Sequence, residues 1–386
     1  MFRIGEEEKA AVARVIDSRS LFKINNSLQE CMHCEEEMKE KFGCEYVTLM
    51  SSGKGALISA LIGAGVGPGD QVIVPGYTYI ATAIAVTAVG AIPVICEADE
   101  TLTLDVKDAE SKITPHTKAI MPVHIQGFPC DMDGIMALAK KYHLAVIEDA
   151  CQADGGRYHG KALGTIGDAG ALSFNYFKII TAGEGGALLT NDRDIFMRGL
   201  IHHDSSAIAF FGNQLDGIDV EPFCGTEFRV SEITGAILRE QLKKLDGILY
   251  DLKRVHDKLK AALADTFRFA PSNDTDGDCN TVLALQFDTV AEAEAFEAKS
   301  GFGRPINTGK HVYCNWTPIM NKRGAFHPAL DPFKMEANKG LVPDYKADMC
   351  PKTLDVLSRT CYIGIDPGLD DEGIASLAAR AKAAKE

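Results

Sequence analysis

The sequence predicts an α/β fold: a large domain with a mostly parallel seven-stranded sheet sandwiched by helices, followed by a smaller C-terminal α+β domain. Seven short apolar runs rich in β-branched residues lie between positions 47 and 190, and each is closed by Gly, Pro, Asp or Ser. Most neighbouring runs are separated by a segment long enough for one crossover helix. This alternation indicates parallel strands covered on both faces, and 386 residues exceed one ordinary domain.

The predicted strands occupy the first half of the chain. They are Val47–Met50, Gln71–Pro75, Ile92–Ala98, Ala119–Ile125, Ala145–Asp149, Ala169–Phe174 and Gly186–Thr190. Between the fourth and fifth runs, Asp133–Tyr142 has apolar residues at the spacing of a helix. Right-handed crossovers place the strand ends, and the loops after them, on one edge of the sheet. Ligands bind at that edge in folds of this class.

The later part of the chain predicts a smaller unit. A long helical pattern from Ser231 to about Leu263 has leucines at helical spacing and links the two domains. The elements predicted after it are a strand at Val282–Phe287, helices near Val290–Lys299 and Asp370–Lys385, and an irregular loop at Arg323–Met349. We therefore expect the large domain, with its amphipathic N-terminal helix, to cover residues 1–250 and the small domain to cover residues 251–386.

Charge and composition limit the class of partner. Asp and Glu number 54 against 40 Lys and Arg, which gives a net charge of −14, and such a surface repels nucleic-acid phosphates. No run of about 18 apolar residues occurs, so no membrane span is expected. Eleven cysteines without a signal-peptide pattern indicate reduced thiols in the cytoplasm. Cys31 and Cys34 form one C-x-x-C without a second pair, so no metal site is expected.

The turn after the first predicted strand suits an anion. It reads S-S-G-K-G-A-L, with Ser52, Gly53 and Lys54 at its centre. A glycine-rich turn that leads into a helix leaves backbone N–H groups free and points the positive end of the helix dipole at a phosphate. The same residue types also make ordinary strand–helix turns, so this turn alone leaves both interpretations open.

Two ionisable side chains follow later strands. Asp149 ends the run A-V-I-E-D, where its carboxylate could hold a proton on the nitrogen of a pyridine ring. Alternatively, it caps a following helix. Lys178 follows an apolar strand and lies between Phe177 and Ile179. Burial among such neighbours disfavours the charged amine and makes it nucleophilic, whereas a lysine that reaches water has no special reactivity.

An aromatic residue completes the pattern. Tyr79 lies in Y-T-Y-I-A-T after the second predicted strand, where it could stack on a flat ring or belong to the core. Asp149 and Lys178 are 29 residues apart, on neighbouring strand ends. A ring partner, a stacking aromatic residue, an anion-binding turn and an activated lysine are together the protein groups that a pyridoxal 5'-phosphate site requires.

Five blocks of sequence are more specific than any single residue. They are P-V-H-I-Q-G-F-P-C-D-M-D (Pro122–Asp133), I-E-D-A-C-Q-A (Ile147–Ala153), G-K-A-L-G-T-I-G-D-A-G-A-L-S-F (Gly160–Phe174), K-I-I-T-A-G-E-G-G (Lys178–Gly186) and F-R-V-S-E (Phe228–Glu232). With these blocks the chain resembles the DegT/DnrJ/EryC1/StrS family of sugar aminotransferases, from its N-terminal helix to about Pro367. The resemblance implies the aspartate-aminotransferase-like fold, pyridoxal phosphate as cofactor, and a homodimer with shared active sites.

The resemblance also implies roles for matching residues. Lys178 would form a Schiff base with the cofactor and move the proton, and Asp149 would pair with the ring nitrogen. The other implied contacts are Gln152 near the ring hydroxyl, Tyr79 on the ring face, His124 close to the cofactor, and Ser52, Gly53 and Ser173 at the phosphate.

The chain departs from the family pattern at three places. Lys54 stands where a threonine usually contacts the phosphate, and it could bind that phosphate by charge instead. Glu227 stands where an asparagine usually reaches the phosphate of the neighbouring subunit, which is unfavourable for a carboxylate. The segment His311–Pro318 is only loosely similar to its family counterpart. The expected substrate-binding residues are Arg229, which would face a neighbour's site, and His311, Tyr313 and Asn315.

These observations predict a pyridoxal-phosphate-dependent aminotransferase of amino-sugar biosynthesis. It would move an amino group from glutamate or glutamine to a keto-sugar, either free or linked to a nucleotide or phosphate, or to a keto-polyol. A sugar dehydratase of the same family is one alternative, although those enzymes replace the lysine with histidine. A cofactor-binding regulatory protein without turnover is another. A nucleotide-binding protein is disfavoured because neither G-x-G-x-x-G nor G-x-x-x-x-G-K-[ST] follows the first strand.

Overall fold

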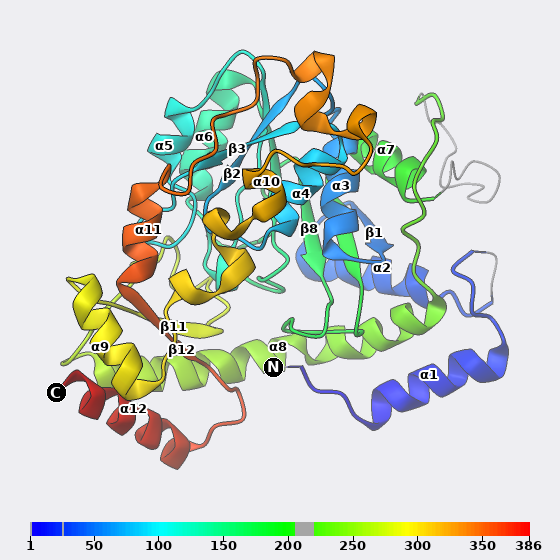
Figure 1. Ribbon diagram of the computed structural model, residues 1–386. Helices are drawn as coiled ribbons and strands as arrows, with labels where there is room; N and C mark the ends of the chain where they lie inside the picture. The colour runs from blue at the N-terminus through cyan, green and yellow to red at the C-terminus, as the bar shows by residue number, and fades with distance from the viewer. Residues whose placement is uncertain (1, 25–26, 205–219) are drawn as a thin grey trace.

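A computed structural model describes residues 2–24, 27–204 and 220–386 of the chain (Figure 1). Its centre is a seven-stranded sheet with the strand order β1-β9-β8-β5-β4-β2-β3. The strands are β1 (Tyr46–Met50), β2 (Gln71–Pro75), β3 (Ile92–Cys96), β4 (Thr117–Ile120), β5 (Ala145–Asp149), β8 (Ala169–Ser173) and β9 (Gly186–Thr190). Neighbours pair in parallel except β9, which runs antiparallel to both β1 and β8. The predicted mostly parallel seven-stranded sheet is confirmed.

The predicted strand Ala119–Ile125 differs most from the structure. The expected run Ala119–Ile125 leaves the sheet after Ile120, where β4 ends. Pro122 follows at once and has no N–H to donate to a ladder. Its carbonyl oxygen accepts a 2.8 Å bond from the backbone N–H of Asp149, and Val123 then forms an isolated bridge with the same residue. The prediction was wrong here because an apolar run does not reveal where its hydrogen bonds stop.

Side chains alternate between the two faces of the sheet, and each face has its own core. Ile73 and Ile120 belong to one core, whereas their neighbours Val72 and Ala119 belong to the other, as the two-residue period of a strand requires. The first core is covered by α2 (Glu30–Phe42), α6 (Met132–Tyr142) and α8 (Glu232–Leu263), and the second by α3 (Gly53–Gly63) and α4 (Ala81–Ala88). Helices therefore sandwich the sheet, as predicted.

The large domain contains further helices and one hairpin outside the central sheet. They are α1 (Glu6–Ser18), which packs on α8, together with α5 (Val106–Ser111), α7 (Arg193–His203) and the hairpin β6 (Arg157–Tyr158) and β7 (Lys161–Ala162). Within the described ranges, no helix combines the length and apolar character needed to span a bilayer.

The C-terminal part forms a second, smaller sheet. It consists of the antiparallel strands β10 (Arg268–Phe269), β11 (Val282–Gln286) and β12 (Thr360–Gly364) with α9 (Val290–Ser300), α11 (Pro351–Ser358) and α12 (Asp371–Lys385). The helix α8 crosses the lower half of the view, above α1 and α12, and connects the two sheets along the chain (Figure 1). This agrees with the predicted α+β unit. Because α8 continues without a break through residue 250, the division into residues 1–250 and 251–386 stays a prediction.

A segment of the C-terminal part returns to the large sheet. Between α9 and α11 the chain forms α10 (Thr317–Met320) and several short 3-10 turns. Tyr313, Trp316 and Tyr345 from this segment are buried in the same core as α3 and α4. Backbone N–H groups of Thr78 and Ile80 donate to the carbonyls at positions 311 and 310. These bonds hold residues 309–316 against the loop that follows β2.

Gly186, the first residue of β9, passes directly over the start of α3. A Cβ at this position would lie 2.4 Å from the carbonyl carbon of Ser52 and 2.5 Å from the backbone nitrogen of Gly53. Both atoms belong to the backbone and cannot rotate away. Glycine therefore allows β9 and α3 to approach at this distance.

We expect Gly186→Ala to lower the free energy of unfolding by about 1–3 kcal/mol, the usual cost of overpacking. Gly364→Ala in β12 is the matched control, because no atom lies within 4 Å of a Cβ there. Urea unfolding followed by circular dichroism measures both variants. Equal stability of the two would contradict the close contact of β9 with α3.

Candidate active site

Three chain segments meet at the start of α3. Ser52 caps this helix, and its hydroxyl oxygen accepts a 3.0 Å hydrogen bond from the backbone N–H of Gly55. A Cβ on Gly53 would lie 2.6 Å from Sγ of Cys151 and 2.8 Å from Cβ of Ser173. The turn after β1 is therefore packed against the loop after β5 and the end of β8. The first turn of α3 brings the positive end of its dipole to this point.

Asp149 ends β5 beside this turn, and its carboxylate is held by two donors. One oxygen accepts a 2.7 Å bond from the hydroxyl of Thr82 on α4, and the other accepts a 3.2 Å bond from the backbone N–H of Cys151. Asp149 is buried and Thr82 is completely buried. No helix begins after Asp149 before the hairpin β6–β7. The alternative that Asp149 caps a helix is therefore wrong.

Lys178 follows β8 and is half-buried between exposed Phe177 and buried Ile179. Its backbone N–H donates to the carbonyl of Asn175. Its side-chain amine forms no hydrogen bond or ion pair with the described residues. An amine in this position is available to a ligand, because no carboxylate within the described part of the chain neutralises it by direct contact.

Lys178 and Asp149 both influence the same thiol, that of Cys151. Burial raises the pKa of Cys151 well above its usual value, the negative charge of Asp149 raises it further, and the positive charge of Lys178 opposes both. The amine and the carboxylate therefore share one neighbour, which itself touches the start of α3. The structure thus brings together the anion-binding turn, the strand-end carboxylate and the lysine that the sequence singled out.

Tyr79 and His311 form the aromatic side of this group. Their ring centroids are 5.3 Å apart with an interplanar angle of 51°, and Tyr79 is 44% exposed. Burial lowers the pKa of His311, and the positive charge of Lys178 lowers it further. His311 is therefore close enough to feel the amine, and its imidazole is neutral at pH 7.

Gln152 and His124 support the loops beneath the site. The amide oxygen of Gln152 accepts a 3.1 Å bond from the backbone N–H of Gln126. His124 is completely buried, and its Nδ1 accepts from the backbone N–H of Cys130 while its Nε2 lies 3.0 Å from a carboxylate oxygen of Glu148. Since Nδ1 accepts, the ring proton is on Nε2 and is donated to Glu148.

The other residues predicted to bind substrate, Tyr313, Asn315 and Arg229, form hydrogen bonds or ion pairs within the chain. Tyr313 is completely buried, and its hydroxyl donates to the carbonyl of Ala347. Asn315 is exposed and donates to the carbonyl of Gly309. Arg229 forms ion pairs with Asp204 and with Glu227 and lies over the ring of Phe22. Lys54 is exposed at the start of α3.

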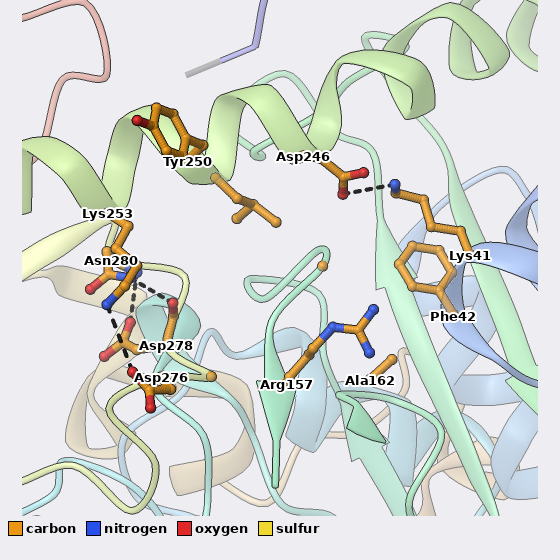
Figure 2. A pocket seen from close by; sticks show the side chains of 13 residues that line it. Lys41, Phe42, Arg157, Ala162, Asp246, Tyr250, Lys253, Asp276, Asp278 and Asn280 are labelled. Atoms are coloured by element: carbon orange, nitrogen blue, oxygen red, sulfur yellow. Dashed lines mark hydrogen bonds and ion pairs between the residues drawn. The ribbon is translucent and has the colours of Figure 1, made fainter. Parts of the chain in front are cut away.

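A separate pocket of about 280 Å³ lies between α8, the β6–β7 hairpin and the loop 276–280 (Figure 2). None of its lining residues is among the predicted site residues. Two of its lysines are already paired: Lys41 lies 2.8 Å from a carboxylate oxygen of Asp246, and Lys253 lies 3.2 Å from one of Asp257. This pocket therefore lacks the free amine that distinguishes the group around Lys178. No cluster suited to a metal occurs in the described ranges.

The family profile of the DegT/DnrJ/EryC1/StrS aminotransferases matches residues 3–310. The chain belongs to this family, and the resemblance seen in the five sequence blocks is confirmed.

Two relatives indicate the chemistry found in the family. GDP-perosamine synthase of Caulobacter vibrioides is 38% identical over 259 residues, which cover 66% of this chain and 66% of that enzyme. The L-glutamine:2-deoxy-scyllo-inosose aminotransferase of Streptomyces lividus is 35% identical over 241 residues, or 61% of this chain and 56% of that enzyme. The match spans about two thirds or less of the length of each relative.

A solved structure shares the fold over almost the whole chain. The GDP-4-keto-6-deoxy-D-mannose-3-dehydratase of E. coli, solved with bound hydrated pyridoxal phosphate, superimposes with a TM-score of 0.81 and covers 99% of this chain and 98% of its own. The two sequences are 20% identical, so this likeness shows the fold alone.

Two residues of the site were missed from the sequence. Thr82 is the last residue of the motif Y-T-Y-I-A-T, and its position one helical turn after Tyr79 was the available signal. Asp154 lies with Gln152 in the loop that follows β5 and is completely buried. Its only signal was a carboxylate within a run of small residues.

We expect Thr82→Val to lower the free energy of unfolding by about 1–3 kcal/mol at pH 7, because it leaves a buried carboxylate oxygen without its donor. Thr87→Val is the control on the same helix, since that hydroxyl donates only to the carbonyl of Ile84 one turn earlier. Denaturant unfolding of cofactor-free protein measures both. A smaller loss for Thr82→Val than for Thr87→Val would show that the bond to Asp149 contributes nothing.

Proposed function

We propose that this chain is a pyridoxal-phosphate-dependent aminotransferase that transfers an amino group from glutamate or glutamine to a keto-sugar or keto-polyol. One observation carries the proposal: the amine of Lys178 has no hydrogen bond or ion pair with the described residues, and the doubly held carboxylate of Asp149 adjoins Cys151, which touches the start of α3. An amine, a carboxylate and an anion-binding helix end are therefore within one small region. Membership of the aminotransferase family supports the same assignment.

The residues of this region fit the cofactor. Its phosphate would be held at the start of α3 by Ser52, Gly53 and Ser173, with positive charge from Lys54. Glycine at position 53 fits because any side chain would strike Cys151 and Ser173. The remaining contacts would be Asp149 at the ring nitrogen, Tyr79 on the ring face, Gln152 near the ring hydroxyl and Lys178 as the covalent attachment.

Each protein group has a defined task in the transfer. When bound, the cofactor supplies an electron-accepting ring that makes the hydrogen on the amine-bearing carbon acidic. Lys178 removes that proton at Nζ as a free base and returns it to the acceptor carbon. Asp149, oriented by Thr82 and by the N–H of Cys151, holds the proton on the ring nitrogen.

The identity of the amino-group acceptor is less narrowly defined than that of the donor. Relatives of this chain are named for a sugar nucleotide and for a cyclic polyol ketone, which supports a hydroxyl-rich ketone here. We place its hydroxyl groups near His311, the predicted substrate residue whose imidazole feels the charge of Lys178. A homodimer with shared sites is part of the proposal, and in it Arg229 would face the neighbouring subunit.

The covalent attachment can be tested directly. After incubation with pyridoxal phosphate and reduction with borohydride, we expect a pyridoxyl group on the peptide that contains Lys178. Lys178→Ala should lose the modification, whereas the exposed lysine variant Lys299→Ala should keep it. Peptide mass spectrometry identifies the site. Modification of Lys178→Ala to the wild-type extent would refute the assignment.

The reaction itself can be tested with glutamate or glutamine and a panel of keto-sugars and keto-polyols. We expect release of the corresponding 2-oxo acid with at least one hydroxyl-rich ketone, and a loss of about 10³-fold or more in rate for Lys178→Ala, the scale of a lost general base together with its covalent role. Amine transfer to simple keto acids alone would change the substrate class. Elimination of water from the sugar would favour the dehydratase.

A further inference from the structure

Gln126, in the loop after β4, has a backbone conformation that a glutamine does not favour. Its φ is 53° and its ψ is 18°, in the left-handed region that glycine enters freely and most other residues avoid. A residue stays in such a conformation only where its surroundings fix it. The backbone N–H and C=O of Gln126 both have side-chain partners, and these come from different parts of the chain.

The N–H of Gln126 is turned to the loop after β5. It donates a 3.1 Å hydrogen bond to the side-chain amide of Gln152. Because a backbone N–H can only donate, the atom that it meets is the amide oxygen Oε1. The Nε2 group of Gln152 is the other end of this amide, and it donates to no atom of the described residues. Gln152 therefore offers a ligand a hydrogen-bond donor and not an acceptor.

The C=O of Gln126 is held by the C-terminal sheet. It accepts a 2.6 Å hydrogen bond from the hydroxyl of Thr281, which directly precedes β11 and is 5% exposed. The carbonyl of Thr281 in turn accepts a 2.9 Å bond from the backbone N–H of Ile365, directly after β12. The pairing of β11 with β12 therefore sets the position of the Thr281 hydroxyl.

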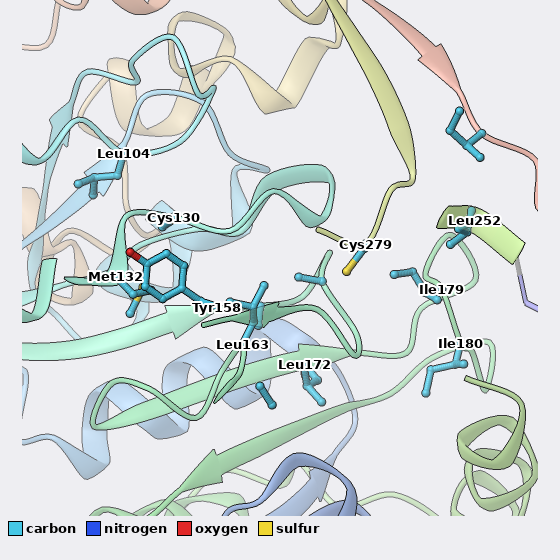
Figure 3. Close-up of a cluster of buried hydrophobic side chains, with 14 of the residues drawn as sticks. Leu104, Cys130, Met132, Tyr158, Leu163, Leu172, Ile179, Ile180, Leu252 and Cys279 are labelled. Carbon is cyan, nitrogen blue, oxygen red and sulfur yellow. The ribbon is translucent and has the colours of Figure 1, made fainter. Parts of the chain in front are cut away.

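A second contact attaches the same loop to the C-terminal part. The N–H of Cys279 donates a 3.2 Å bond to the carbonyl of Gly127, and a Cβ on Gly127 would lie 2.4 Å from Cβ of Cys279. Cys279 is itself buried in the main core with Leu163 and Ile179 (Figure 3). Two successive carbonyls of the loop after β4 are thus bound by the segment that leads into β11.

We propose that Thr281 is a positioning residue of the cofactor site. Through the peptide of Gln126 it fixes Gln152 with Oε1 occupied, so that Nε2 is the group that Gln152 offers to the ring hydroxyl oxygen of the cofactor. A donor at that oxygen favours its negatively charged form. The inference rests on the proposed function and extends it, because two hydrogen bonds join a residue of the C-terminal sheet to a cofactor-binding side chain.

A positioning role and a merely structural role differ in the ligands that they affect. A general loss of order at the site weakens the binding of every ligand there. A misplaced Gln152 weakens only ligands that carry the ring hydroxyl. The compound 3-deoxypyridoxal 5'-phosphate has the phosphate, the aldehyde and the ring nitrogen of the cofactor but lacks that hydroxyl, so it separates the two roles.

The test measures the dissociation constants of both compounds by absorbance titration of cofactor-free protein. We expect Thr281→Val to weaken binding of pyridoxal phosphate about fivefold, the scale of one net hydrogen bond, and to leave binding of the 3-deoxy compound unchanged. Gln152→Ala should show the same selectivity. Thr281→Ser keeps the hydroxyl and should bind both compounds as the wild type does.

Thr360→Val is the matched control. Its hydroxyl also donates to a backbone carbonyl of the C-terminal part, that of Val356, at 2.7 Å, so this variant should change neither dissociation constant. Equal weakening of both compounds in Thr281→Val, or weakening of neither, would overturn the proposal. A wild-type protein that binds neither compound would refute the proposed function and this inference with it.

A second measurement uses the wild type alone and covers the case in which Thr281→Val does not fold. Coupling between two sites is reciprocal, so a ligand that engages Nε2 of Gln152 should in turn stabilise the bonds of the loop to the C-terminal part. We expect the N–H groups of Gln126 and Cys279 to exchange with deuterium more slowly with pyridoxal phosphate bound than with the 3-deoxy compound bound. Mass spectrometry of the two peptides measures this. Equal exchange in the two complexes would contradict the link.

Discussion

The contact at Gly53 is the constraint on which the whole edge of the sheet depends. Three segments meet there without room for a side chain: the turn after β1, the loop after β5 and the end of β8. Gly186 imposes the same condition from β9. Because parallel strands deliver their carboxyl ends to one edge, this packing brings a helix end, a carboxylate and an amine together. Any displacement of α3 would separate the anion-binding turn from both ionisable groups.

Asp149 and Asp154, five residues apart, show how hydrogen bonding and burial give two carboxyl groups different properties. Asp149 accepts from a hydroxyl and a backbone N–H, so its orientation is determined and its charge is supported by fixed dipoles. Asp154 has neither support: it is completely buried, and neither of its carboxylate oxygens has a hydrogen-bond partner among the described residues. The first is suited to hold a ring nitrogen in place, whereas burial without donors disfavours the charged form of the second.

The C-terminal part contributes to the site by returning to the large sheet. Tyr313 and Trp316 are buried anchors, and the backbone bonds at Thr78 and Ile80 then set His311 against Tyr79. Specificity for the proposed acceptor is accordingly expected in the less buried residues beside these anchors, such as His311 and Asn315. The side chains of Tyr313 and Trp316 are buried and make their hydrogen bonds within the chain, so they are not available to a substrate.

The sequence by itself determined the succession of strands and helices along the chain and the motif residues Asp149 and Lys178. It could do so because apolar periodicity and turn residues are local properties. It also carried the family resemblance. Only the tertiary structure decided that Thr82 holds Asp149 across 67 positions, that Asp154 is buried without a hydrogen-bond partner among the described residues, and that Tyr313 is an anchor. Those relations depend on which residues become neighbours when strands and helices pack. The spacing of residues along the sequence does not reveal those distances in space.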